Sequence, residues 1–106
     1  MDFNIDATLK DMLEAIEGKL SADWAKIKDI ATGFFNDSKL RLETLAEARI
    51  NNEISDSFLQ KRLADEKNLQ QANFDTLKII AKSDAQQAIN AAFDILENAI
   101  KKAIGI

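Results

Sequence analysis

The side chains in this sequence best suited to chemistry are acidic residues that recur in close pairs. Carboxylate oxygens are the ligands that magnesium and calcium prefer, so pairs of them on a helix face raise the question of a metal site. Lysines and arginines surround most of these pairs, which is typical of a solvated helix face. We therefore expect no metal site and no other cofactor. The pairs are Glu14 with Glu17, Glu43 with Glu47, Asp65 with Glu66, and Asp94 with Glu97.

The chain contains no histidine and no cysteine. Its serines therefore lack an imidazole base, and no lysine follows a serine at the Ser-x-x-Lys spacing that could replace one. Thiol catalysis, disulfides and the Glu-x-x-His ligands of di-metal helical bundles are excluded for the same reason. We predict that the protein has no catalytic residues and is not an enzyme.

The charge pattern bears on the partners that the protein could have. The net charge is -4, and the lysines and arginines are scattered among acids, whereas nucleic-acid binding draws on clustered positive charge. The first four residues, Met-Asp-Phe-Asn, do not resemble a secretory leader, and no apolar run approaches the roughly 20 residues that span a bilayer. We expect a cytoplasmic protein with no nucleic-acid partner, and a membrane role is disfavoured.

Proline is absent, glycine occurs three times and helix-forming residues dominate, so we predict an all-α fold in a single domain over residues 1–106. One clear corner divides it. Ser55 can cap a helix that starts after it, and Ile54 and Leu59 have the spacing of a hydrophobic staple. Asn51 and Asn52 can end the preceding helix. These signals predict a helix over about 6–50, a corner at 51–55 and a helix over about 56–104.

Two series of positions at helical spacing accompany these helices. Folded as an antiparallel hairpin, helices of this length would each be about 70 Å long and would place residue i near residue 106 minus i. Gly33 would then leave room for the ring of Phe74. The series are Leu9, Leu13, Ile16, Leu20, Trp24, Ile27, Ala31, Phe34, Ser38, Leu42, Leu45 and Arg49, followed by Leu59, Leu63, Glu66, Gln70, Phe74, Leu77, Ala81, Ala85, Ala88, Ala92, Leu96, Ala99 and Ala103.

Three residues of these series are unusual for a helix core. Trp24 is interpreted as a core anchor and not as a platform for a cofactor. Glu66 and Gln70 fall at core positions opposite Leu40 and Asn36. We expect the hairpin to loosen there, the alternative being that these polar groups are buried and specify the register of pairing.

A second architecture is kept open, a compact monomeric bundle of three or four helices with breaks near 18–21 and 82–84. Gly18 could end a helix and Ser21 could begin the next. Ser83 with Gln86 has the spacing of a capping box. The apolar series keeps its phase through both places, which favours continuous helices and the long hairpin.

The C-terminal segment, residues 85–106, carries more apolar surface than one neighbouring helix can cover, and such a surface is typical of an interface. We predict that two hairpins pair through it into a dimeric four-helix bundle, since two-fold homodimers are the commonest assemblies. Three apolar residues of the first helix are assigned to the same interface. The predicted interface residues are Ala85, Ala88, Ile89, Ala92, Phe93, Ile95, Leu96, Ala99, Ile100 and Ile104, with Met12, Ile30 and Phe35.

These observations lead to two hypotheses of function. The first is a non-enzymatic, self-associating helical scaffold or protein-interaction module, which is homodimeric and has an unidentified protein as a further candidate partner. The alternative is a membrane-active helical hairpin that uses the amphipathic segment 85–106. That segment contains Asp94 and Glu97 beside Lys101 and Lys102, a poor match to the basic helices that lie on membranes.

Overall fold

The computed structural model describes residues 3–105 and contains three helices. They are α1 (Ile5–Ile50), α2 (Asp56–Asp75) and α3 (Lys82–Ile104), and no strand occurs among the described residues. The predicted all-α class is confirmed. The molecule measures 40 × 22 × 21 Å with a radius of gyration of 13.6 Å, so the compact bundle describes it and the long hairpin does not.

The predicted corner lies where the sequence places it. The Ser55 hydroxyl accepts a hydrogen bond of 3.1 Å from the backbone N–H of Phe58, the capping interaction expected of this serine. Asn51 follows the last residue of α1, and Asn52 adopts a left-handed backbone with φ of 60°. Asparagine tolerates this conformation better than most residues, which explains the Asn-Asn pair at this reversal.

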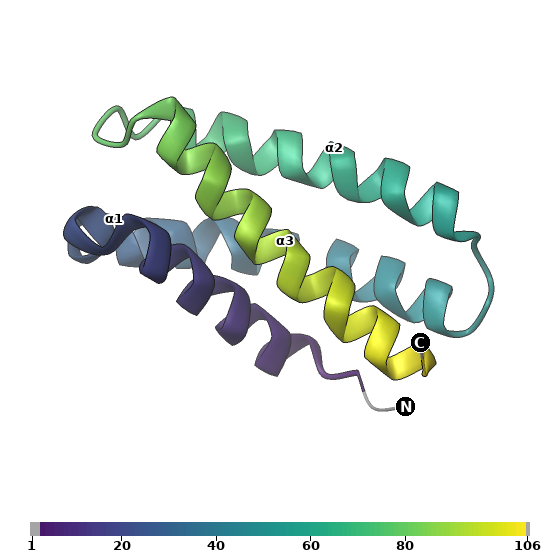
Figure 1. Cartoon of the computed structure of the whole chain (residues 1–106). Helices are drawn as coiled ribbons and strands as arrows, with labels where there is room; N and C mark the ends of the chain where they lie inside the picture. Colours follow the sequence, from purple (N-terminus) through teal and green to yellow (C-terminus); the bar gives the residue numbers. More distant parts are fainter. Residues whose placement is uncertain (1–2, 106) are drawn as a thin grey trace.

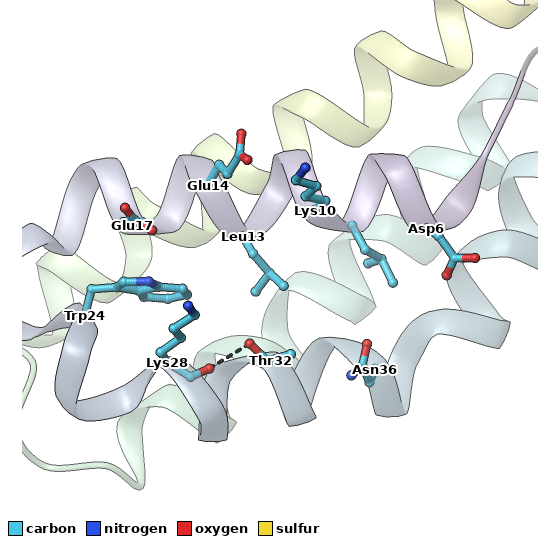
Figure 2. A pocket seen from close by; sticks show the side chains of 10 residues that line it. Asp6, Lys10, Leu13, Glu14, Glu17, Trp24, Lys28, Thr32 and Asn36 are labelled. Carbon is cyan, nitrogen blue, oxygen red and sulfur yellow. Dashed lines mark hydrogen bonds between the residues drawn. The ribbon is translucent and has the colours of Figure 1, made fainter.

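The first helix doubles back on itself. A straight helix of 46 residues would be about 70 Å long, whereas the longest dimension of the molecule is 40 Å. Figures 1 and 2 show the reversal between Glu17 and Trp24. Gly18 and Ser21 lie in this segment, and glycine and serine are common where helices bend. We call residues 5–20 the first arm of α1 and residues 24–50 the second arm.

The predicted helix over 56–104 is corrected to two helices, because α2 ends at Asp75 and α3 begins at Lys82. The Thr76 hydroxyl donates to the Asn73 carbonyl at 2.6 Å, and Lys78 has a left-handed backbone with φ of 66°. The break lies just before the predicted 82–84, and the N-cap of α3 is Ala81 in place of Ser83. Two β-branched residues, Ile79 and Ile80, follow Lys78 and favour a non-helical segment.

The four helical segments form an up-and-down bundle of two layers (Figure 1). One layer, called the α1–α2 layer, consists of the second arm of α1 and of α2. The other layer consists of the first arm and α3, and the start of the first arm lies close to the end of α3. One continuous hydrophobic core lies between the layers, with Met12, Phe35, Phe74 and Phe93 at 0% exposure. Trp24 belongs to this core, as predicted.

Candidate interaction surface

Most residues of the predicted dimer interface lie inside the single chain. Ile95, Ala99 and Ile104 are half-buried, and Ile30 alone among them is exposed. The fully buried ones are Ala85, Ala88, Ile89, Ala92, Phe93, Leu96, Ile100, Met12 and Phe35. The expectation that one chain cannot cover the C-terminal ridge is therefore corrected. It assumed a straight hairpin in which α3 has a single neighbour, whereas the bend in α1 and the turn before α3 surround α3 with three segments.

Aromatic contacts show how the chain covers this ridge. The ring centroids of Phe35 and Phe93 are 6.4 Å apart, and those of Phe35 and Phe74 are 6.5 Å apart with the rings near perpendicular. The Lys67 ammonium lies 6.0 Å from the centroid of the Phe93 ring. One cluster thus joins α1, α2 and α3. The ridge is part of the core of the monomer and is not a free surface for a second molecule.

A polar network crosses the α1–α2 layer where loosening was expected. Arg41 donates from Nε to Glu66 Oε1 at 2.7 Å, from Nη2 to Glu66 Oε2 at 3.2 Å, and from Nη2 to the Ser38 hydroxyl at 3.0 Å. Gln70, which is fully buried, donates to the same hydroxyl at 2.9 Å. The loosening expected there is corrected, because Gln70 is buried and hydrogen-bonded, as the alternative required, whereas Glu66 is half-buried and its partner Arg41 is exposed. A role of this network in fixing the register stays a prediction.

The register of this layer agrees with the sequence to within about two residues. The partners of Glu66 and Gln70 are Arg41 and Ser38, where Leu40 and Asn36 were expected. Phe74 packs against Phe34, with ring centroids 5.8 Å apart. The position of the corner sets the register of the antiparallel pair, so the partners could be placed to within about two residues without knowledge of the bend.

A groove lies on the outer side of this layer, with a cavity volume of about 450 Å³. We call it the α1–α2 groove. Leu40, at its edge, is 72% exposed, although leucine is usually covered. Two arginines and two acids stand at its rim, so both signs of charge are present. Its lining residues are Leu40, Arg41, Thr44, Leu45, Arg62, Asp65 and Glu66.

Several exposed apolar side chains belong to the two helical segments of this layer. Five large ones are exposed among residues 3–105, and four of them belong to the second arm or to α2: Ile30, Leu40, Phe58 and Leu69. The fifth, Ile79, lies in the connection before α3. Of these five, Leu40 is the one that lines the groove. On α2, Phe58, Arg62, Asp65 and Leu69 step by four, three and four and form a second stripe beside the buried one, which the sequence predictions did not include.

A second concave region lies between the two arms of α1 (Figure 2). Leu13 points into this cleft, and the indole of Trp24 lies across its closed end near Glu17 and Lys28. The cleft has a volume of about 370 Å³, and charged side chains of both arms surround it. The Nε1 of Trp24 is buried without a hydrogen-bond partner among the described residues. The cleft marks the inside of the bend.

Ion pairs also join the helical segments at the surface of the bundle. The hydrogen bond to Glu66 raises the pKa of the Arg41 guanidinium above its ordinary value. Lys39, on the second arm, donates a hydrogen bond to the Asp6 carboxylate on the first, and this hydrogen bond raises the pKa of the lysine. Both cations therefore stay charged throughout the neutral range. The first pair joins α1 to α2, and the second joins the two arms.

The acidic pairs of the sequence do not converge. Within residues 3–105, no group of three or more acidic side chains lies close enough together to hold a metal ion. In the same part of the chain, none of the helices is long and apolar enough to cross a membrane. Comparison of the chain with models of known protein families, with characterised proteins and with solved structures finds no match, so its function has to be argued from its own geometry.

Proposed function

We propose that the protein is a non-enzymatic helical module that binds a second copy of itself through the outer side of the α1–α2 layer. The observation that carries this proposal is the exposure of Leu40, 72%, at the edge of the α1–α2 groove, with Phe58 and Leu69 also exposed on α2 of the same layer. Large apolar side chains left exposed beside a groove are typical of an interaction site. A non-enzymatic role is supported by the lack of histidine and cysteine in the sequence.

The charges at the groove favour a second copy as the partner. In a two-fold dimer the same patch meets itself, so it must carry groups that attract one another. Arg62 and Asp65 provide both signs on α2, 3.5 Å apart within the chain, and Arg41 and Glu66 do so beside them. A strongly basic or acidic partner would meet repulsion from half of these groups. The homodimer predicted from the sequence used another surface, the C-terminal ridge, which is buried in the core, so the present proposal does not rest on it. A cytoplasmic location stays a prediction.

The membrane-active alternative has no comparable support. Its segment, residues 85–106, would have to present Ile89, Phe93 and Leu96 to lipid, and these side chains are buried in the core. Membrane binding would therefore require the bundle to open, at the cost of exposing this core to water.

The test is the oligomeric state of Leu40→Glu, measured by sedimentation equilibrium over a wide range of concentrations. Leu40 is exposed, so the variant should fold as the wild type does, but it should weaken the dimer at least tenfold because a carboxylate replaces an apolar contact. Ile79→Glu is the matched control, since it makes the same change of charge at an exposed apolar residue outside the groove. Equal dimerisation of both variants, or a wild type that stays monomeric at all concentrations, would refute the proposal.

A further inference from the structure

The buried residues of α1 keep one helical phase through the bend. Ile16, Leu20, Trp24 and Ile27 are all buried, and they step by four, four and three across the point where the helix reverses. Were α1 straight, these four side chains would still form one continuous stripe. A chain that only needed to reverse here would gain nothing from preserving the phase.

The same holds on the other side of the molecule. The positions Phe74, Leu77, Ala81, Ala85 and Ala88 step by three, four, four and three across the connection between α2 and α3. Phe74, Ala85 and Ala88 are buried, and Leu77 packs against the core from a half-buried position. Ala81 is exposed here, and in a straight helix over residues 56–104 all five positions would lie on one face.

The α1–α2 layer keeps one register. Facing residues of the second arm and α2, such as Ser38 with Gln70 and Phe34 with Phe74, have numbers that add up to 108. In the other layer, the start of the first arm lies beside the end of α3, because Asn4 and Thr8 line one cavity with Ala99 and Lys102. A straight hairpin would keep the α1–α2 layer paired as it is and would bring the same two ends together.

We propose that the chain has a second, open form in which α1 is straight and α2 continues into α3, and that two open chains interlock as a domain-swapped dimer. Opening breaks only the contacts between the two layers, among them Phe35 with Phe93 and Asp6 with Lys39. A second copy restores the same contacts, because the first arm and α3 of each chain pack on the α1–α2 layer of the other chain. Exchange of identical elements is a low-cost route to dimers.

In the closed form, the connection between α2 and α3 has unfavourable features that the open form lacks. Lys78 has a left-handed backbone, which is unfavourable for a residue with a Cβ, and Ala81 caps α3 without a side-chain hydrogen bond. In the open form both residues lie inside a helix. The bend in α1 requires little rebuilding, because its backbone is helical on both sides and the chain has no proline. Closure is favoured at low concentration and exchange at high concentration.

This inference is independent of the proposed function. The α1–α2 groove lies on the outside of its layer in both forms, so the swapped dimer forms whether or not the groove binds. If the groove does bind a second copy, each swapped dimer has two such surfaces and can extend into larger assemblies. Leu40→Glu, which weakens the groove, should leave the swapped dimer unchanged.

The test joins engineered cysteines, in a chain that has none of its own, with a short bis-maleimide. The variant Asp6→Cys with Lys39→Cys links the two layers, and Arg41→Cys with Glu66→Cys links the second arm to α2. Each is refolded from urea at high concentration, and the dimer is isolated, cross-linked and run on a denaturing gel. In the swapped dimer, 6/39 links join two chains, whereas 41/66 links stay within one chain.

Lys78 provides a second measurement. Lys78→Gly relieves the left-handed strain of the closed form and weakens the helix of the open form. Each effect shifts the equilibrium between the two forms towards the closed form by about fivefold per chain. The dissociation constant of a dimer of two such chains should rise roughly several-hundred-fold. Lys78→Ala is the matched control, because it removes the same side chain but keeps the strain and favours the helix, so its dimer should be no weaker than that of the wild type.

Solution scattering distinguishes the two shapes directly, since a rod of about 70 Å has a radius of gyration of roughly 20 Å against 13.6 Å for the closed chain. The inference would be overturned by a dimer whose 6/39 links stay within single chains, by equal effects of the two Lys78 variants, or by refolding that gives only monomer. A dimer of closed chains that Leu40→Glu abolishes would support the proposed function and refute the swap.

Discussion

The second arm of α1 meets its two neighbours with different chemistry. Towards α3 it presents Phe35, which packs on Phe93 among alanines and leucines. Towards α2 it presents Ser38 and Arg41, which bond to Gln70 and Glu66. Apolar burial is strong and does not depend on direction, whereas a buried hydrogen-bond network is satisfied in only one alignment. The contacts with α3 are apolar, whereas those with α2 combine the packing of Phe74 with hydrogen bonds that one alignment satisfies, so we expect α2 to contribute more to register and α3 more to stability.

The largest effect is expected where α3 enters the core. Phe93→Ala should lower the free energy of unfolding by about 3–5 kcal/mol, because it leaves a cavity beside Phe35 that the bundle cannot fill. Urea unfolding followed by circular dichroism measures this. Phe58→Ala, at a 42% exposed position, is the matched control and should cost less than about 1 kcal/mol. A similar loss in both variants would contradict the assignment of α3 to the core.

The next effect tests the network between α1 and α2. Gln70→Ala should cost about 1–3 kcal/mol, since it creates a cavity and removes the donor that reaches Ser38 and the Phe34 carbonyl. Gln70→Met keeps the volume without the hydrogen bonds and should cost less in stability. If register depends on this network, amide protons of the α1–α2 layer should exchange faster in Gln70→Met even where its unfolding midpoint is unchanged. Unaltered exchange would remove the specific role of α2.

The same comparison explains which parts of the fold could be predicted from the sequence. The corner at 51–55, the pairing of the second arm with α2 and the burial of the apolar series follow from local capping signals and from stripe phase. Local signals indicate the bend near Gly18 and the break after Asp75 only as an alternative, because the same stripe serves a straight helix and a folded one equally well. The shape depends on whether closure within one chain or pairing between two chains has the lower free energy, and no local sequence pattern reports that difference.

The candidate site could be predicted only in part. The C-terminal ridge was identified as a surface that needs a partner, and its partner proves to be α1 of the same chain. The outer stripe of α2 was overlooked because Arg62 and Asp65 alternate with Phe58 and Leu69, so that its mean hydropathy is low. Exposure of single apolar residues becomes informative only once the neighbouring helix is known to leave them uncovered.

A smaller effect concerns Gly33, which was expected to make room for Phe74. A Cβ built on Gly33 would meet no atom within 4 Å, whereas Phe74 rests on the rings of Phe34 and Phe35. That expectation is corrected, and the glycine only weakens the second arm. Gly33→Ala should therefore raise the free energy of unfolding by up to about 1 kcal/mol, measured by thermal unfolding. Destabilisation would show that the α1–α2 layer needs a close approach at this point.

The smallest effect is expected at the rim of the same layer. Glu66→Gln keeps an acceptor for Arg41 but removes the charge, so it should cost less than about 1 kcal/mol at low salt. Salt screens the ion pair of the wild type and leaves the neutral variant nearly unaffected, so the difference between the two should shrink as ionic strength rises. A difference independent of salt would mean that Arg41 and Glu66 act mainly through the shape of the network. In that case the register would depend on the geometry of the hydrogen bonds to Ser38 and Gln70, and the charge at the groove would remain free to act on a second molecule.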